Sequence, residues 1–337
     1  MNTVSQPFRA SMREILQSAN STPTPHRLGA NSPVVLIVLL ALLCIAISIG
    51  SSRFYAIENI TAILRQCALV LIIGSGMTLL LIAAEVDLSV GASMAFAGMI
   101  AMDVTNQTGS VWLGAAAGIL FGGLVGLVNA IIVTRLKVKS LIATIAAMMI
   151  LQGGVFLYSR QAIQNNNQLP AFTAISTGFF GPVPVPVLIA AIIFICTYIV
   201  LRHTLFGRYV YAVGSNPQAA RLSGLNPERL KQILFIVTGL LAGLSGLILA
   251  SLMNAGQPTA GRGFELTVIA AVILGGTSLN GGRGTLLGTL LGVLILQVIN
   301  DGIIILGWDQ ELQLVVPGIV IVLAAYLDIV RRRAGAR

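Results

Sequence analysis

Three carboxylates stand within or beside long apolar stretches of this chain. Glu85 and Asp87 interrupt a stretch that runs from about Ala68 to Met102, and Glu265 precedes another. A carboxylate at the centre of a bilayer is disfavoured by roughly 2.5–3.5 kcal/mol, so such residues tend to be functional or interfacial. One interpretation is a pathway or an ion site. The other, equally favoured, is that Glu85 and Asp87 cap the next helix, because a helix N-terminus favours acids.

Few residues of this chain could support catalysis or metal binding. His26 lies in a polar N-terminal segment and His203 in a basic loop, without metal-ligating partners nearby. Cys44, Cys67 and Cys196 lie inside apolar runs without metal-ligand spacing, so we interpret them as small core residues. The serines show no nucleophile-elbow pattern. The sequence therefore predicts no catalytic site, no metal site and no enzyme.

The composition indicates that membrane lipid, and not water alone, surrounds much of this chain. Of 337 residues, 56% are hydrophobic and 9% are charged, whereas a soluble domain has about 25% charged residues. Apolar runs of about 20 residues, the length that crosses a bilayer, recur along the chain. Segments of roughly ten residues with alternating polarity, which are typical of a membrane barrel, do not recur. The predicted fold class is an all-α integral membrane protein with about ten transmembrane helices.

The predicted spans are apolar runs bounded by charged or turn residues. A polar leader of residues 1–32 precedes the transmembrane domain, residues 33–330, and a basic tail of residues 331–337 follows it. The first run is expected to be a retained helix and not a cleaved signal. The spans cover residues 33–50, 62–84, 89–104, 111–133, 141–159, 185–201, 231–253, 266–281, 284–306 and 312–330.

Basic residues favour one orientation. With both termini inside, sixteen lysines and arginines fall in inner segments and four in outer ones, a strong positive-inside bias. We therefore expect a cytoplasmic leader and a cytoplasmic tail. The net charge of +9 follows from this orientation and does not indicate nucleic acid, because aromatic residues do not interleave with the basic ones. The four outer residues are Arg53, Arg65, Arg160 and Arg262.

Glycines recur every fourth residue in two predicted spans. Such a stripe lets another helix pack closely, since lipid gives helices no hydrophobic reason to associate. The stripes are Gly114, Gly118, Gly122 and Gly126 in the fourth span, and Gly284, Gly288 and Gly292 in the ninth.

The two stripes also suggest an internal repeat. They are equivalent if spans 2–5 and 7–10 belong to two copies of a five-helix unit, and an odd unit repeated in tandem must be inverted. The third and eighth spans agree, because each opens with an acid followed by a short helix rich in small residues. Short segments at matched positions indicate a transport pathway. The candidate pathway residues are Glu85, Asp87, Ser89, Glu265, Thr277 and Ser278.

The inner loop of residues 202–230 offers a surface for a soluble partner. Ser215 or Asn216 can cap a short helix there, Pro217 suits its first turn and Gly224 can end it. A helix lying across the cytoplasmic face is a natural docking element. The alternative is a plain connector.

Three motifs carry a resemblance to a known family. The inner loop is similar to the coupling-helix segment of the ribose-type sugar permeases of ABC importers, whose substrates are pentoses and hexoses. The segments Glu85–Gly91 and Gly263–Gly284 are similar to two further motifs of this family, in the expected order. The similarity runs from about residue 33 to residue 330. Glu85 and Val86 depart from the family, which usually has Gly and Ile there.

The resemblance implies a permease in a bacterial inner membrane. Its expected partners are a second permease copy, identical or related, an ABC ATPase subunit, a periplasmic sugar-binding protein and membrane lipid. In the family, ATP closes the ATPase, which pulls on the coupling loop and rocks the two permeases. We expect a bulky acid at Ala220 to leave the fold intact and abolish uptake. The coupling residues would be Gly207, Arg208, Tyr211, Gly214, Asn216, Ala219, Ala220 and Gly224.

ATP itself has no predicted site in this chain. Lys137, Lys139 and Lys231 are its only lysines, and none stands in a phosphate-binding G-x-x-x-x-G-K-[ST] loop. We therefore expect no cofactor here, and ATP with Mg²⁺ on the separate ATPase.

A different class of function stays open. Glu85, Asp87 or Glu265 could couple an ion gradient to transport in a secondary transporter. A membrane-embedded enzyme is disfavoured by the absent catalytic clusters. The residues do not identify the sugar.

Overall fold

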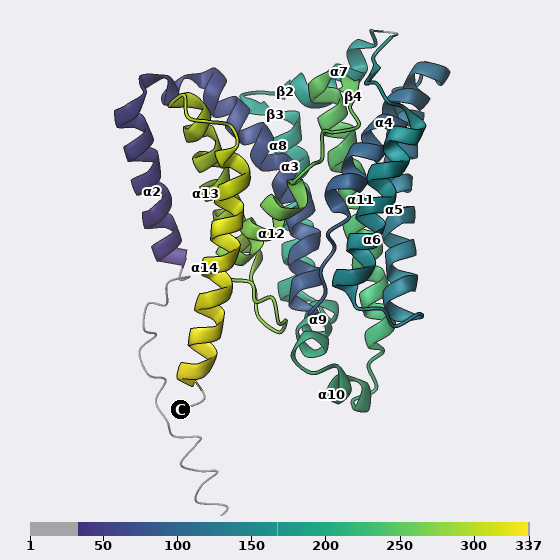
Figure 1. Ribbon diagram of the computed structural model, residues 1–337, viewed down its shortest axis with the longest axis vertical. Coiled ribbons are helices and arrows are strands. Elements are labelled where there is room, and N and C mark those ends of the chain that lie inside the picture. The colour runs from purple at the N-terminus through teal and green to yellow at the C-terminus, as the bar shows by residue number, and fades with distance from the viewer. Residues whose placement is uncertain (1–32, 167, 336–337) are drawn as a thin grey trace, which may run out of the picture.

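The computed structural model describes residues 33–166 and 168–335 and confirms the all-α class (Figure 1). The predicted leader, residues 1–32, lies outside the described residues. The helices are α2 (Pro33–Gly50), the 3-10 helix η1 (Ser52–Tyr55), α3 (Ile57–Ile82), α4 (Val90–Thr108), α5 (Val111–Thr134), α6 (Ser140–Tyr158), α7 (Pro170–Thr177), α8 (Val185–His203), α9 (Leu205–Ser215), α10 (Pro217–Leu222), α11 (Pro227–Met253), α12 (Phe264–Leu274), α13 (Leu286–Ile305) and α14 (Leu312–Gly335).

Short strands occur at one end of the bundle. β1 (Ile163–Gln164) pairs antiparallel with β4 (Ala255–Gly256), and β2 (Phe179–Phe180) pairs with β3 (Val183–Pro184). In Figure 1 these strands and α7 lie at the top, whereas α9 and α10 lie at the bottom. We call these the α7 end and the α9 end.

Each predicted span contains a helix, but the helices differ in their ability to cross a membrane. Within the described residues, seven helices are long and apolar enough: α2, α3, α5, α6, α8, α11 and α13. α4 has 19 residues but carries Asp103, Asn106 and Gln107 in its second half. Among the described side chains, α14 contributes the shorter apolar stretch Leu312–Leu323. The number of ten crossings stays a prediction.

The eighth span is shorter than predicted. α12 ends at Leu274 instead of residue 281, because Gly275 and Gly276 follow and Gly276 has a φ of +91°, a left-handed conformation that a side chain disfavours. Its 11 residues reach about 16 Å, roughly half the hydrocarbon thickness. Loop 275–285 then leads to α13, so Gly284 precedes this helix and does not belong to its stripe.

The C-terminal boundary also moves. Helix α14 continues to Gly335, so most of the predicted tail of residues 331–337 is helical backbone, and residues 336 and 337 lie outside the described part. At the α9 end, α11 begins at Pro227, four residues before the predicted span.

The core forms around α3, whose second half is buried on all sides. It packs with α11, α12 and α13 in one apolar cluster that includes Ile72, Met77, Ala242, Val272 and Leu296. α2, α13 and α14 lie on one side of Figure 1, α4, α5, α6 and α11 on the other, and α12 in between at middle height. A helix that is apolar all round suits such a central position.

Glycines set the distance between α5 and its neighbours. A Cβ on Gly122 would lie 2.3 Å from the carbonyl oxygen of Gly239 on α11, and one on Gly126 would lie 2.4 Å from that of Phe235. Gly118 contacts the backbone of Ala97 on α4 in the same way, at 2.8 Å. Gly288 and Gly292 of α13 pack equally closely on α12. The pairs α4–α5 and α12–α13 are thus packed alike, while the inverted repeat stays a prediction.

These contacts predict a difference between two glycines. The change Gly122→Ala should destabilise the protein by about 1–3 kcal/mol, because the methyl group overpacks against backbone. It should lower the midpoint of thermal unfolding in detergent. The control is Gly153→Ala on α6, where a Cβ meets no atom within 4 Å and alanine favours the helix. Equal midpoints for the two variants would contradict the packing argument.

Candidate functional site

The first turns of α4 and α12 meet in the middle of the bundle. A Cβ on Gly91 would lie 2.5 Å from the carbonyl oxygen of Gly261 and 2.2 Å from Oε2 of Glu265, and a Cβ on Gly261 would lie 1.9 Å from the oxygen of Gly91. The two predicted matched segments are therefore in contact. The chain reaches this point through non-helical residues 83–89 from the α9 end and 254–263 from the α7 end. Such backbone is tolerated at membrane depth only inside protein or beside water.

Asp87 stands in a buried hydrogen-bond network. Its Oδ1 accepts from the backbone N–H of Ser89 at 2.8 Å and from Ser89 Oγ at 2.6 Å, just before α4 begins. Asn129 on α5 donates to Ser89 Oγ at 2.9 Å and to both oxygens of Asp87 at 3.4 Å. Asp87 thus holds Ser89, the residue that precedes α4, and does not itself accept from the first turn of the helix; the capping alternative stays a prediction. Asn129 was missed, although a lone asparagine in an apolar span is the signal for such a contact.

Glu85 has a different partner. Lys231 on α11 donates from Nζ to its Oε1 at 2.5 Å, and the two side chains are 9% and 19% exposed. This pair ties the α3–α4 turn to the first turns of α11. From the sequence, Lys231 is only an inner positive charge, because a pairing across 146 residues leaves no local pattern.

The remaining pathway candidates lie in two places. Glu265 is buried in the first turn of α12, and its Oε2 has no hydrogen-bond partner within the described part of the chain. Thr277 and Ser278 are buried in loop 275–285, towards the α9 end, where Thr277 contacts Gly284. The six candidates therefore do not converge on one binding site.

The inner loop folds into two helices, α9 and α10, where the sequence predicted one. Thr204 caps α9 by accepting from the N–H of Gly207 at 3.4 Å. Asn216 caps α10 by accepting from Gln218 and Ala219 at 3.0 Å. Pro217 occupies the first turn, and Gly224, just beyond the end, has a φ of +84°. The order of cap, proline and glycine predicted α10, whereas α9 was missed.

Burial divides the predicted coupling residues into two sets. Gly207, Gly214 and Ala220 are buried and Tyr211 is partly buried, so they hold α9 and α10 against the bundle. Arg208, Asn216, Ala219 and Gly224 are exposed, so a partner can contact them. Ala220, at 5% exposure, belongs to the cluster around Leu234 and Phe235. A bulky acid there would disturb the fold, and the expectation that it leaves the fold intact is wrong.

Leu222 is an exposed residue that the sequence analysis did not select. It ends α10 and is 91% exposed. A single exposed apolar residue is common on protein surfaces, so its position on α10, and not its exposure, makes Leu222 a candidate for contact with a partner.

Helix α9 contacts the ends of two other segments. Tyr211 Oη donates to the carbonyl oxygen of Gly284 at 2.7 Å. The backbone N–H of Gly282 donates to the carbonyl oxygen of Ile82, the last residue of α3, at 2.8 Å. A Cβ on Gly214 would lie 1.7 Å from the same Ile82 oxygen. Burial raises the pKa of the Tyr211 hydroxyl and Arg202 partly offsets this, so the phenol stays protonated and donates. A movement of α9 must therefore move the α3 end and loop 275–285.

A cleft of about 1040 Å³ opens beside α10 at the α9 end. It lies between the α3–α4 turn, the α5–α6 loop, the start of α11 and loop 275–285. Lys137, Lys139, Arg221 and Lys231 outnumber Glu85 and Glu228 along its walls, so the cleft is basic.

The Glu85–Lys231 pair predicts a charge-swap experiment. Glu85→Lys alone should lower stability by up to about 3–5 kcal/mol, because it leaves a largely buried charge unpaired. Combining it with Lys231→Glu should recover most of the thermal midpoint in detergent. The control is Glu228→Lys. Glu228 forms an ion pair with Arg221, and the two side chains are 42% and 65% exposed, so this pair should contribute only about 0–1 kcal/mol. A double variant no better than the single one would show that the pair is not stabilising.

Comparison with known proteins places the chain among transport proteins. The family model described as branched-chain amino acid transport system / permease component matches residues 59–325. The ribose import permease protein RbsC of Escherichia coli K12 is 40% identical over 300 residues, which cover 87% of this chain and 92% of that protein. RbsC of Bacillus subtilis 168 is 38% identical over 290 residues, with 86% and 90% covered.

A relative with another named sugar is similar too. The L-arabinose transport system permease protein AraH of Escherichia coli K12 is 35% identical over 299 residues, with 89% and 91% covered. No solved structure matches the chain. Because the family model and these relatives cover most of its length, the chain belongs to the family of transport-system permease components.

Proposed function

We propose that this chain is the channel-forming subunit of an ATP-driven importer for a sugar, and that the sugar is a pentose. Its relatives over nearly their whole length are named ribose and arabinose permeases. These are permease subunits and not enzymes. ATP and Mg²⁺ would bind a separate ATPase, and a periplasmic binding protein would deliver the sugar.

The contact between α9 and two transmembrane segments is the observation that carries the proposed mechanism. ATP binding closes the ATPase on the exposed side of α9 and α10, around Ala219 and Leu222. Because Gly214 and Tyr211 contact Ile82 and Gly284, this movement passes to residues 83–89 and to loop 275–285. These segments lead to α4 and α12, whose first turns meet at the centre. Two permease copies, identical or related, would then rock about the path between them.

The orientation follows from the same proposal. The α9 end, with its basic cleft and coupling helices, would face the cytoplasm of a bacterium, as would both termini, and the α7 end would face the periplasm across the inner membrane. Lipid surrounds exposed apolar side chains such as Leu157 and Ile150, which are 89% and 73% exposed.

An ion-coupled secondary transporter receives less support. Glu85 is paired with Lys231, and Asp87 is held by Ser89 and Asn129. Neither of these two carboxylates is an open ion ligand in this arrangement, whereas Glu265 has an unpartnered Oε2 within the described chain. The relatives named above are permeases of sugar transport systems, which favours the importer.

Reconstitution tests the function directly. Liposomes that contain the permease with its ATPase should take up radiolabelled D-ribose or L-arabinose when ATP is inside and the binding protein outside. Leucine serves as the competing substrate class, because the family model is described for branched-chain amino acids. Uptake of leucine alone would overturn the proposed substrate. Uptake driven by a proton or sodium gradient through the permease alone would overturn the ATP-driven mechanism.

Leu222 provides a test of coupling. Leu222→Glu should change the free energy of unfolding by no more than about 0.5 kcal/mol, since exposed substitutions rarely do more. The thermal midpoint in detergent should therefore stay close to that of the wild type. Uptake and sugar-stimulated ATP hydrolysis should fall at least about tenfold, because the buried centre of an interface disfavours a charge. The matched control is Leu136→Glu, at 67% exposure in the α5–α6 loop, which adds the same charge on a segment other than α9 and α10. Full activity of the Leu222 variant would remove α10 from the docking surface.

A further inference from the structure

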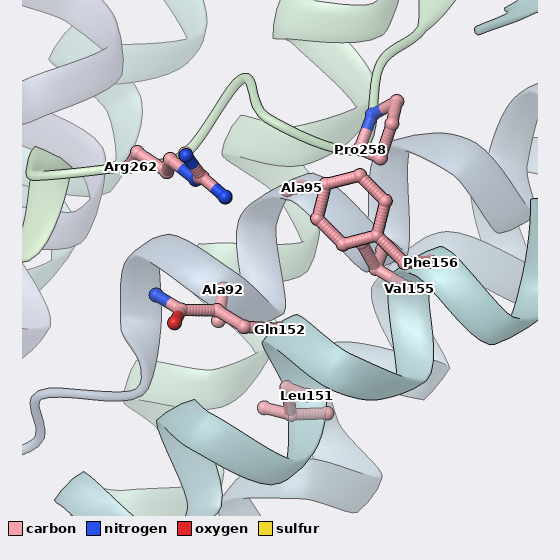
Figure 2. A pocket seen from close by; sticks show the side chains of 9 residues that line it. Ala92, Ala95, Leu151, Gln152, Val155, Phe156, Pro258 and Arg262 are labelled. Atoms are coloured by element: carbon pink, nitrogen blue, oxygen red, sulfur yellow. The ribbon is translucent and has the colours of Figure 1, made fainter. Parts of the chain in front are cut away.

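A small hollow lined by apolar residues and two polar side chains lies beside the first turns of α4, at the level where α4 and α12 meet. Its walls come from Ala92 and Ala95 of α4, from α6 residues between Leu151 and Phe156, and from the loop before α12. In Figure 2 the Arg262 guanidinium and the Gln152 carboxamide face the same open space, next to the Phe156 ring. Two elements far apart in the sequence, α6 and the loop before α12, thus bring two polar groups and an aromatic ring together beside α4.

Arg262 has an unusual position for a charged residue. The sequence analysis assigned it to an outer segment, but its neighbour Gly261 packs on Gly91 inside the bundle. Arg262 is exposed and has no ion pair within residues that the structure describes; its guanidinium carbon lies 5.9 Å from the centre of the Phe156 ring. An arginine at membrane depth needs water or a protein partner. The face that bears it is therefore turned towards a water-filled path and not towards lipid.

Gln152 is a second polar side chain, on α6, that faces this hollow. Gln152 is twelve residues from Ser140, the first residue of α6, and six from Tyr158, the last, which is about 18 Å and about 9 Å of helix. It is partly buried and directed to the Arg262 side. An amide at this depth also requires a polar neighbour, and the path supplies one.

The chemistry of the hollow fits a neutral polyol. A guanidinium donates hydrogen bonds, a carboxamide both donates and accepts, and an apolar ring covers the carbon face of a sugar. Arg262 is the only charged side chain among the residues that line the hollow in the described chain. The hydroxyl groups of a neutral polyol can accept from the guanidinium and can exchange hydrogen bonds in both directions with the carboxamide.

We infer that Arg262, Gln152 and Phe156 contact the sugar as it crosses the membrane. The enclosed volume is about 10 Å³, room for one water, so this surface is one wall of the path. The second permease copy supplies the facing wall. This inference rests on the proposed function and names the residues that touch its substrate.

Cysteine labelling tests the position of Arg262. Replacing Cys44, Cys67 and Cys196 by serine gives a background into which Arg262→Cys is introduced, in the complex with ATPase and binding protein. A charged methanethiosulfonate reagent should modify this cysteine from water, and the transported pentose should slow the modification in the presence of ATP. Leu157→Cys, on the lipid side of α6, should stay unmodified. An unmodified residue 262, or modification that sugar does not slow, would overturn the inference.

Transport measurements test the contact itself. Arg262→Leu and Gln152→Leu should reduce the sugar moved per ATP hydrolysed about tenfold, the effect of losing a charge-assisted or buried polar contact. Arg262→Lys should recover part of the loss, which a purely structural defect would not allow. Leu157→Ala should match the wild type. Unchanged sugar per ATP in both leucine variants would overturn the inference while wild-type uptake still supports the proposed function; if the wild type takes up no sugar, the proposed function itself fails.

Discussion

The backbone contact between Gly91 and Gly261 is the constraint on which the centre of this molecule depends. Lipid cannot satisfy free peptide groups, so a chain that leaves helical structure at membrane depth must be covered by protein or water. Here two such segments, residues 83–89 and 254–263, end against each other, and a Cβ on Gly261 would lie 1.9 Å from the Gly91 oxygen. Without side chains at these two positions, α4 and α12 can both begin in the middle of the membrane.

The same contact connects the two functional ends. Residues 83–89 join it to the end of α3, which α9 touches through Gly214. On the other side, Gly261 belongs to the loop of residues 254–263, which also carries Arg262. The Asp87 network keeps the first segment in one shape, because Ser89 and Asn129 both donate hydrogen bonds to it. Close backbone packing and hydrogen bonds therefore connect α9 with the loop that carries Arg262. Under the proposed function, this is the route by which a movement of α9 would reach the sugar path.

The sequence predicted what depends on local composition. Apolar runs located the helices, and the Asn216, Pro217 and Gly224 signals located α10, because helix length and caps are properties of neighbouring residues. It did not predict where α12 ends, because the predicted span of residues 266–281 runs past Gly275 and Gly276, where the backbone turns. Nor did it separate buried Ala220 from exposed Ala219, because a six-residue helix is too short to show a period. Long-range partners such as Asn129 and Lys231 depend on packing, which no local pattern records.

Glu85 illustrates how a departure from a family pattern is accommodated. The resembling permeases usually have glycine at this position, whereas this chain places a carboxylate in the turn after α3. An isolated charge there would be strongly disfavoured, since its side chain is only 9% exposed. Lys231 stands within 2.5 Å of it and would itself be an unpaired, partly buried cation if Glu85 were absent. The two residues therefore explain each other, and their pair holds the α3–α4 turn against α11, the helix that directly follows the coupling segment.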